Sequence, residues 1–312
     1  MRRVSKVKIR FLICDPVHEE GIRKMKEKGF DVDTKPEIST EELKKIVPDY
    51  DVLIVRSRTK VTTEIIRCGK RLKIIGRVGV GLDNVDVRSA EEMGITVLNT
   101  PETAATAVAE LTIGLTLSLA RKIPQADRSM KEGKWIKKEL EGWQLKGKTL
   151  GLIGFGNIGM KVAEIAKSFG MRILVNKRTP PSQELLEKTG ARFVPLEELL
   201  KESDIVSLHV PLTKETCKMI GARELNLMRD GAFLINTSRG AIIDEEALWK
   251  ALQSGKLGGA ALDVYESEPP TDHRLINLAN IVCTPHIGAQ TEEAQRDASI
   301  RLAEKIINML GK

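Results

Sequence analysis

The chain has 312 residues, of which 41% are hydrophobic and 4% aromatic, and its formal net charge at pH 7 is +7. This length is sufficient for two domains of ordinary size. The few aromatic residues argue against stacking platforms for single-stranded nucleic acid. Lysines and arginines are scattered among the 43 acidic residues, so we expect no nucleic-acid partner, and at most a local site for a small anion.

The four cysteines stand far apart in the sequence, without the C-x-x-C spacing of zinc sites. Cys14 and Cys283 fall within apolar runs that we interpret as buried strands. These patterns predict neither a bound metal nor a disulfide framework. The apolar runs are too short for a signal segment or a membrane span, so we expect a cytoplasmic protein with no membrane partner.

Between Lys8 and Thr100, short apolar runs alternate with polar amphipathic stretches. The runs predict strands at 9–14, 51–55, 72–78 and 96–98, and the stretches predict helices at 19–28, 41–47 and 87–93. Alternation of strands and helices is typical of a parallel sheet covered on both faces.

A long Ala-rich segment, 102–122, follows Pro101 and is interrupted by Pro124, which predicts one helix. This helix is apolar around most of its circumference and must therefore be covered. Its cover is either its own domain or a second subunit, and we favour a dimer contact.

The alternation then resumes, with strands predicted at 150–153, 172–175, 205–209, 232–236, 260–264 and 281–284 and helices at 158–169 and 291–310. The chain path indicates an α/β protein of two doubly wound parallel-sheet domains. Residues 1–100 with 287–312 form the first domain, and residues 101–286 form the second.

A glycine-rich turn, Gly154-Phe155-Gly156-Asn157-Ile158-Gly159, lies between a predicted strand and a predicted helix. In a dinucleotide-binding turn the first glycine permits the sharp bend, the second lets the backbone approach a pyrophosphate, and the third lets helix and strand pack closely. The amides that begin the helix then face the phosphates.

The next strand ends in Asn176-Lys177-Arg178-Thr179, where an Asp or Glu would bind the adenine ribose of NAD. Two cations and no carboxylate would attract a 2′-phosphate, so NADP is expected to be tolerated or preferred. The alternative is that both cations are ordinary exposed loop charges.

Three polar residues follow predicted strands where ligands bind in open α/β sheets: Arg239, Glu268 and His286. Oxidation of a 2-hydroxy acid needs a base for the hydroxyl proton, a cation for the carboxylate and a hydride acceptor. His286 and Arg239 match the first two needs. Glu268 is placed to orient the imidazole and to favour its protonated form.

Several motifs together resemble the D-isomer-specific 2-hydroxyacid dehydrogenases, and among them most closely the phosphoglycerate dehydrogenases. The resemblance covers essentially the whole chain, and the motifs that carry it are 55–61, 76–86, 109–112, the glycine turn, 209–211, 236–240, 262–269 and 284–289. It implies a flavodoxin-like substrate-binding domain, a Rossmann dinucleotide-binding domain, and Arg239, Glu268 and His286 as the catalytic residues.

The resemblance also implies the binding residues. Those for NAD or NADP are Gly154, Gly156, Asn157, Ile158, Gly159, Lys177, Arg178, Thr179, His209, Val210, Pro211, Thr237, Ser238, Arg239, Asp263, His286, Gly288 and Ala289. Those for the small-molecule substrate are Arg56, Ser57, Arg77, Val78, Gly79 and Val80, with Arg239 and His286. Amides of 78–80 would meet the substrate carboxylate and Arg56 and Arg77 its phosphate, unless these arginines bridge acidic neighbours instead.

The resemblance favours oxidation of D-3-phosphoglycerate to 3-phosphohydroxypyruvate by a homodimer. The run Lys177-Arg178-Thr179 departs from that branch and is more similar to NADP-dependent hydroxypyruvate and glyoxylate reductases, which are the alternative. A remote alternative is a dinucleotide-sensing corepressor without enzymatic activity. The chain ends after the last predicted helix, so no regulatory domain is expected.

Overall fold

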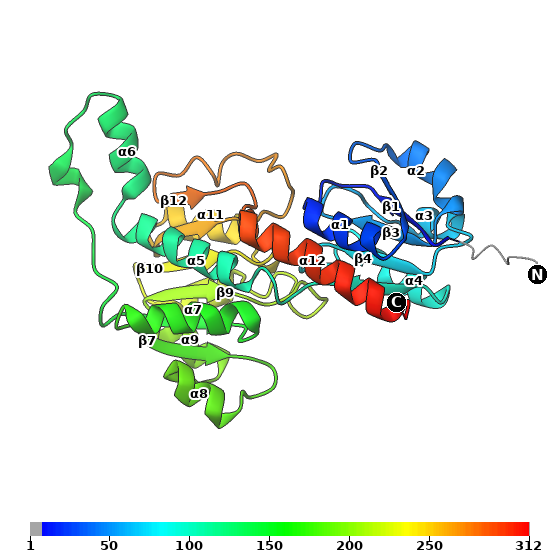
Figure 1. The fold of residues 1–312 in the computed structure, drawn as a ribbon. Coiled ribbons are helices and arrows are strands. Elements are labelled where there is room, and N and C mark those ends of the chain that lie inside the picture. The colour runs from blue at the N-terminus through cyan, green and yellow to red at the C-terminus, as the bar shows by residue number, and fades with distance from the viewer. Residues whose placement is uncertain (1–7, 312) are drawn as a thin grey trace, which may run out of the picture. The chain divides into compact units, whose positions relative to one another are not determined.

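A computed structural model describes residues 8–311 of the chain (Figure 1). The chain divides into two compact units: one runs up to Ala104 and resumes at Ala289, and the other is Ala105–Gly288. The predicted boundaries, at 100 and 287, lie a few residues from these. Residues 1–7 of the predicted first domain lie outside the described residues.

The first unit is built on a five-stranded sheet in which every pairing is parallel. Its strand order is β2-β1-β3-β4-β5, which is the flavodoxin-like order. The strands are β1 (Arg10–Ile13), β2 (Asp31–Thr34), β3 (Val52–Val55), β4 (Ile74–Arg77) and β5 (Thr96–Asn99).

Helices cover both faces of this sheet. They are α1 (Glu19–Glu27), α2 (Thr40–Ile46), α3 (Thr63–Cys68), α4 (Val87–Glu92) and α12 (Glu292–Met309), with a 3-10 turn, η1 (Val47–Asp49). One core lies under α2, α3 and α4, and the other lies under α1 and α12. Leu302 and Ile306 of α12 pack on Gly76 of β4, which fixes the returning segment to the first unit (Figure 1).

The second unit is built on a seven-stranded, wholly parallel sheet of order β12-β11-β10-β9-β6-β7-β8. Counted from β6, the order is 3-2-1-4-5-6 with one further strand, which is the Rossmann arrangement. Its strands are β6 (Thr149–Ile153), β7 (Arg172–Asn176), β8 (Ala191–Phe193), β9 (Ile205–Leu208), β10 (Ala232–Asn236), β11 (Leu257–Leu262) and β12 (Ile281–Cys283). The two sheets confirm the predicted fold class.

Two sets of helices enclose this second sheet. On one face lie α5 (Ala105–Ala120), α7 (Asn157–Ser168) and α8 (Gln183–Thr189), and on the other lie α9 (Leu196–Glu202), α10 (Ala222–Leu227) and α11 (Glu245–Gln253). The remaining elements are α6 (Ile123–Lys131) and two 3-10 turns, η2 (Lys137–Leu140) and η3 (Gly240–Ile242).

The long apolar helix predicted at 102–122 is shorter in the structure. α5 ends at Ala120, and Lys122 has a φ of 51°, so the chain turns before Pro124 opens α6. α5 packs against α7, β10, β11 and β12 of its own unit. Its own unit therefore covers much of the apolar surface of α5, whereas Thr106, Glu110 and Gly114 stay exposed. The dimer contact of this helix stays a prediction.

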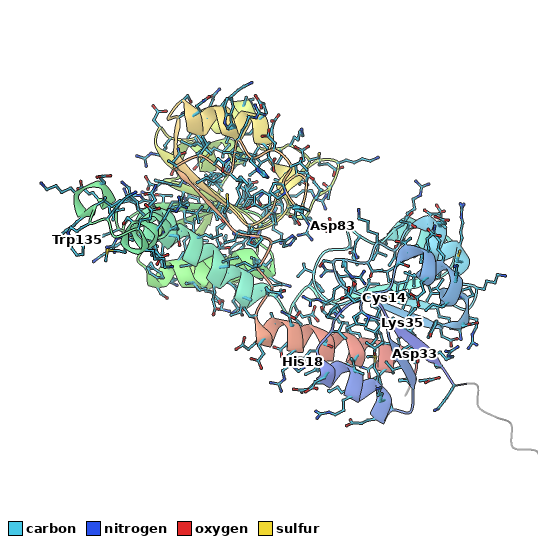
Figure 2. The ribbon with its side chains drawn as sticks, turned by 90° about the horizontal axis from the view of Figure 1, so that it is seen from above. Cys14, His18, Asp33, Lys35, Asp83 and Trp135 are labelled. Atoms are coloured by element: carbon cyan, nitrogen blue, oxygen red, sulfur yellow. The ribbon has the colours of Figure 1, made fainter. Side chains whose placement is uncertain are left out.

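The segment after α5, residues 121–143, makes an excursion from the body of the second unit that we call the arm (Figure 1). Trp135 lies at its far end (Figure 2). Three large apolar side chains of the arm are exposed: Ile123 at 49%, Met130 at 57% and Trp135 at 78%. Over residues 8–311, no helix combines the length and the apolar character needed to cross a membrane.

One prediction about the strands is wrong. The run that contains Cys283 is not a buried strand, because β12 is the edge strand of its sheet and Cys283 is exposed. Cys14, in contrast, is fully buried next to β1, as expected.

Candidate active site

The carboxyl edge of the second sheet carries the three predicted catalytic residues. Arg239 follows β10, Glu268 follows β11, and His286 follows β12, and these three strands are neighbours in the sheet. Because parallel strands end at one edge, the three side chains belong to the same edge of the unit.

Glu268 and His286 form a direct pair. Oε2 of Glu268 lies 2.7 Å from Nδ1 of His286, and Oε1 accepts a hydrogen bond of 3.2 Å from the Tyr265 amide. Burial acts to raise the pKa of Glu268, but the hydrogen bond and charge of His286, with the Tyr265 amide, outweigh it and lower the pKa. The pair leaves the other ring nitrogen of His286 to act on a ligand.

The loop that carries His286 is held by Asp263, whose side chain is buried. Its carboxylate accepts hydrogen bonds from the Ile287 and Gly288 amides, both at 2.8 Å, and from the Thr284 hydroxyl at 2.6 Å. The His286 amide also donates to the Asp263 carbonyl, at 2.8 Å. These contacts support His286 in its left-handed conformation, with a φ of 53°.

The loop that carries Arg239 is equally constrained. The Asn236 side chain donates to the Arg239 carbonyl at 2.9 Å and accepts from the amide and hydroxyl of Ser238. Gly240 lies so close to the Tyr265 backbone that a Cβ would collide with it. The Thr237 hydroxyl lies 3.0 Å from that of Thr112 on α5, and both residues are buried.

The glycine turn fits a dinucleotide on its geometry. Gly154 has a φ of 100°, and a Cβ there would strike the His209 carbonyl. A Cβ on Gly159 would strike the Gly154 carbonyl, whereas one on Gly156 would meet no protein atom within 4 Å. Two glycines therefore serve packing and one leaves the backbone open to a ligand, at the start of the twelve-residue helix α7.

His209 lies directly beneath this turn, after β9. Its amide donates to the Ile153 carbonyl at 2.7 Å, and its Nε2 lies 2.9 Å from the Ser207 hydroxyl. Although part of the residue reaches the surface, Nδ1 is buried with no hydrogen-bond partner among residues 8–311. Burial lowers the pKa of His209 to about 3, so the ring is neutral.

The predicted NADP determinants end β7. Asn176 donates to the Val194 carbonyl at 2.9 Å, and Lys177, Arg178 and Thr179 after it are exposed. Neither cation forms an ion pair with another described residue. Two further predicted cofactor residues follow β9. Val210 is half-buried and Pro211 is exposed.

The first unit holds the predicted substrate residues at the carboxyl ends of β3 and β4, where Val55 pairs with Arg77. Arg56 is half-buried and Ser57 is exposed. The Arg56 guanidinium contacts only neutral oxygens among the described residues: the Pro16 carbonyl at 3.3 Å and the side-chain oxygens of Gln295 and Gln290 at 3.2 and 3.4 Å. It bridges no carboxylate of the chain between residues 8 and 311.

The three backbone amides predicted for the substrate carboxylate differ in availability. The Val78 amide donates to the Val55 carbonyl and the Gly79 amide to the Thr100 hydroxyl, both at 2.9 Å. The Val80 amide donates to no described residue. Arg77 donates to the Val78 carbonyl at 3.2 Å, and a Cβ on Gly79 would collide with its guanidinium. Val80 is thus the amide best placed for a ligand.

Sequence reasoning missed Asp15, whose buried carboxylate fixes the Arg56 loop. It accepts from the Arg56 amide at 2.5 Å, from the Thr59 hydroxyl at 2.7 Å and from Arg58 at 3.1 Å. The available signal was its position two residues after the end of β1, at the same sheet edge as Arg56.

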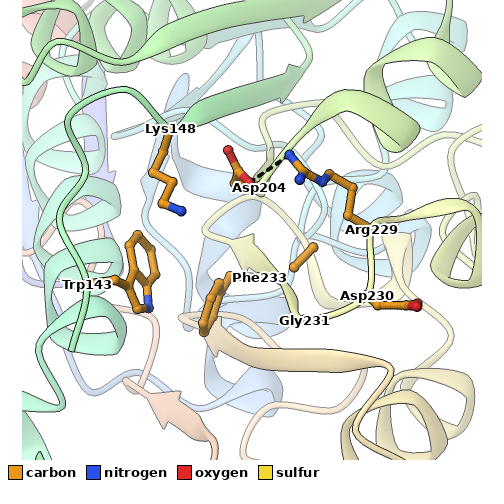
Figure 3. Close-up of a pocket in the computed structure, with 8 residues that line it drawn as sticks. Trp143, Lys148, Asp204, Arg229, Asp230, Gly231 and Phe233 are labelled. Atoms are coloured by element: carbon orange, nitrogen blue, oxygen red, sulfur yellow. Dashed lines mark hydrogen bonds and ion pairs between the residues drawn. The ribbon is translucent and has the colours of Figure 1, made fainter. Parts of the chain in front are cut away.

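Two cavities of the second unit differ in their relation to these residues. One of about 380 Å³ lies beside the Glu268–His286 pair and is bounded by Tyr265, Pro269 and Cys283. The other, of about 270 Å³, lies at the amino ends of the strands between Trp143 and Arg229 (Figure 3). It contains none of the predicted site residues.

The comparisons with known proteins agree with this geometry. Residues 113–288 match the family model described as D-isomer specific 2-hydroxyacid dehydrogenase, NAD binding domain. The chain belongs to the D-isomer-specific 2-hydroxyacid dehydrogenases. This dehydrogenase is therefore an oxidoreductase with an NAD-type dinucleotide domain.

Relatives of this dehydrogenase have several names. It is 51% identical to a hydroxypyruvate reductase of Thermotoga maritima, over 96% of this chain and 97% of that protein. It is 46% identical to a D-3-phosphoglycerate dehydrogenase of Archaeoglobus fulgidus, over 96% of this chain but 57% of that protein. It is 44% identical to a glyoxylate reductase of Thermococcus litoralis, over 96% and 93%.

Solved structures show the same architecture. A protein of Thermus thermophilus has a TM-score of 0.89 at 38% identity, covering 97% of both chains. A D-lactate dehydrogenase of Aquifex aeolicus, solved with NAD and lactic acid, has a TM-score of 0.84 at 30% identity, covering 97% of this chain and 95% of that one. An acyclic imino acid reductase solved with NADPH has a TM-score of 0.89 at 33% identity, covering 97% of both.

Proposed function

We propose that this dehydrogenase interconverts D-3-phosphoglycerate and 3-phosphohydroxypyruvate, the reaction that opens serine synthesis. The observation that carries the proposal is the Arg56 guanidinium, which is half-buried and contacts neutral oxygens rather than a carboxylate. A cation that is partly buried without an acidic partner favours an anionic ligand. Burial lowers the pKa of Arg56, but an arginine stays charged at neutral pH.

The catalytic roles follow from the pair at the edge of the second sheet. His286 takes the hydroxyl proton during oxidation and returns it during reduction, while Arg239 binds the substrate carboxylate. Glu268 holds the ring through its contact with Nδ1 and so fixes its orientation. When bound, the nicotinamide supplies the hydride acceptor or donor.

Replacement of Glu268 tests these roles. A Glu268→Gln variant keeps a hydrogen-bonding group but removes the negative charge beside His286. We expect reduction to slow by about 100-fold or more, the size of a general acid contribution. Initial rates of reduction at a fixed pH measure this effect, and an unchanged rate would remove Glu268 from the mechanism.

For the substrate, initial rates with phosphoglycerate, hydroxypyruvate and glyoxylate decide the proposal. We expect phosphoglycerate and phosphohydroxypyruvate to have the highest kcat/KM. Arg56→Ala should lower the ratio of the phosphoglycerate kcat/KM to that for glyoxylate by about tenfold or more, since a hydrogen bond to a charged group is lost. An unchanged ratio would contradict a phosphate role for Arg56.

NADP as a usable cofactor is part of the proposal, supported by Lys177 and Arg178, which are exposed and form no ion pair with any residue of the segment 8–311. A Lys177→Asp variant should raise the KM for NADP and lower that for NAD, because a carboxylate suits a free ribose hydroxyl and repels a 2′-phosphate. If the wild-type KM for NADP exceeds that for NAD by tenfold or more, the two cations are only loop charges.

The second candidate function is an NADP-dependent hydroxypyruvate or glyoxylate reductase. The relative that favours it is the Thermotoga hydroxypyruvate reductase, because the alignment with this chain covers 97% of that protein. The same rate comparison separates the candidates, since this one predicts poor turnover of phosphoglycerate.

We also propose a cytoplasmic homodimer. The free thiols of all four cysteines suit a reducing compartment. The exposed apolar residues of the arm support self-association, as does a cavity of about 750 Å³ in the same unit, bounded by α5, Trp143 and the segment 276–282.

A further inference from the structure

The Arg56 guanidinium is enclosed by three segments of the first unit. The loop after β1 supplies the Pro16 carbonyl, the segment that leads into α12 supplies Gln290, and α12 itself supplies Gln295. Gln295 lies in the first turns of α12, where its backbone N–H donates to the carbonyl of the N-cap residue Thr291. The two glutamine oxygens contact different nitrogens of Arg56, at 3.2 Å from Nη1 and 3.4 Å from Nη2.

These contacts are long and involve only neutral acceptors. Hydrogen bonds between a guanidinium and a phosphate oxygen are shorter and about twice as strong. A phosphate would therefore displace the glutamine oxygens from Arg56. Asp15 does not compete, because its carboxylate is occupied by the Arg56 amide, Thr59 and Arg58.

A glutamine side chain suits both states of such a subsite. Its amide has an acceptor oxygen and a donor nitrogen, so a half-turn about its last bond exchanges one for the other. Without ligand it offers oxygen to Arg56, and with ligand it offers N–H groups to phosphate. A glutamate at the same position would pair with Arg56 permanently and repel the phosphate.

We infer that Gln290 and Gln295 are specificity residues that complete, with Arg56, a subsite for the phosphate of a phosphorylated 2-hydroxy acid. This inference rests on the proposed function, and it adds the residues that distinguish phosphorylated from unphosphorylated substrates. The nearby Glu292 and Glu293 at the start of α12 are exposed and form no ion pair with Arg56.

The test compares Gln295→Glu with the same substitution at Gln253, an exposed residue at the end of α11 in the other unit. The readout is the ratio of kcat/KM for phosphoglycerate to that for glyoxylate. Gln295→Glu should lower this ratio by about a hundredfold, and Gln295→Met by about tenfold, the loss of one hydrogen bond to a charged group. Gln253→Glu should leave the ratio at the wild-type value.

A second measurement separates failure of this inference from failure of the proposed function. Inorganic phosphate should bind the wild type in a calorimetric titration, and Gln295→Glu should raise its dissociation constant by tenfold or more. If phosphoglycerate is a poor substrate but phosphate binding weakens in this way, the subsite stands and the proposed function falls. If phosphoglycerate is a good substrate and the variant changes neither the ratio nor the dissociation constant of phosphate, the subsite is refuted.

Discussion

Asp263 and His286 belong to one hydrogen-bonded unit, although they are separated by 23 positions in the sequence. Both carboxylate oxygens of Asp263 are occupied by groups of the loop 284–288. The resemblance placed Asp263 among the dinucleotide-binding residues, and these contacts favour a further role as a positioning residue that acts through His286. The distinction can be measured, because a positioning residue affects turnover more than cofactor affinity.

Asp263→Asn tests this role. The new amide group cannot accept on both sides, so at least one buried N–H of the loop loses its partner, at a cost of about 1–3 kcal/mol. We expect kcat to fall by about a hundredfold while the dissociation constant of the dinucleotide changes by less than threefold. Stopped-flow turnover and nicotinamide fluorescence titration give the two values.

Asp204→Asn is the matched control for that variant. Asp204 also uses its carboxylate to bind a backbone amide, that of Thr149 at 2.8 Å, but at the amino ends of the strands (Figure 3). The Asp204→Asn substitution should lower the stability of the protein and leave kcat near the wild-type value. A larger loss of cofactor affinity than of kcat in Asp263→Asn would return Asp263 to the cofactor site.

His209 makes the stability of the second unit depend on pH. Its pKa is lowered to about 3 by burial, whereas an exposed histidine titrates near 6.5. Between these values the unfolded chain binds a proton that the folded chain does not, so the free energy of unfolding falls as the pH drops below about 6.5. The effect between pH 7.5 and 5.0 should be on the order of 1–2 kcal/mol.

Urea unfolding at these two pH values measures the contribution. We expect the pH dependence to be smaller by that amount in a His209→Phe, Ser207→Ala double variant, which removes the titrating ring and its partner together. His273→Gln changes an exposed histidine and should leave the wild-type dependence intact. If the double variant and the wild type show the same pH dependence, His209 does not differ in protonation between the folded and the unfolded chain, and the prediction is refuted.

At the level of the element, the strand–turn–helix from β6 to α7 separates packing from ligand binding. Gly159→Ala should destabilise the protein by about 1–3 kcal/mol, because its Cβ would strike the Gly154 carbonyl. Gly156→Ala has open space at its Cβ and should change the melting temperature little. It should instead weaken dinucleotide binding by about tenfold or more, since the methyl group occupies the approach to the backbone.

Thermal unfolding with and without dinucleotide distinguishes the two variants. Gly156→Ala should lose most of the stabilisation that added dinucleotide gives the wild type, and Gly159→Ala should melt early even without it. Similar behaviour of the two variants in both measurements would contradict the division of roles along this turn.

Short apolar runs predicted the central strands, and amphipathic stretches predicted several of the helices between them, because these elements have a full face to bury. Shorter elements left weaker signals. β2 reads Asp-Val-Asp-Thr and is the edge strand of its sheet, so it lacks an apolar run. α3 has six residues and α10 has six, too few to show a helical period clearly.

Whether a site residue could be predicted depended on whether its role is set by the local sequence or by contacts between distant segments. Arg239, Glu268 and His286 stand within six residues of the ends of strands and within motifs, so they could be selected from the sequence. Gln290 and Gln295 reach Arg56 only because the segment after Gly288 returns to the first unit. Contacts made by tertiary folding across more than 200 residues leave no local pattern to read.

At the scale of the whole molecule, the division of the chain into two units explains which apolar surface remains after folding. α5 packs against its own sheet and α7, which buries nine of its sixteen residues. The arm is not covered in this way, and its three exposed apolar side chains lie within 13 positions of one another. We therefore expect the arm, rather than α5, to form the main contact between two copies.

Trp135→Glu tests this contact. Burial of a tryptophan that is 78% exposed in the single chain is typical of residues that contribute about 2 kcal/mol or more to an interface, which corresponds to at least about 30-fold in the dissociation constant. Sedimentation velocity over a concentration series should show a dimer for the wild type and a shift toward monomer for the variant. Phe169→Glu replaces an apolar residue that is 39% exposed elsewhere in the same unit and should leave the dimer intact. A monomeric wild type would refute the dimer, and a dimer that Trp135→Glu does not weaken would place its interface outside the arm.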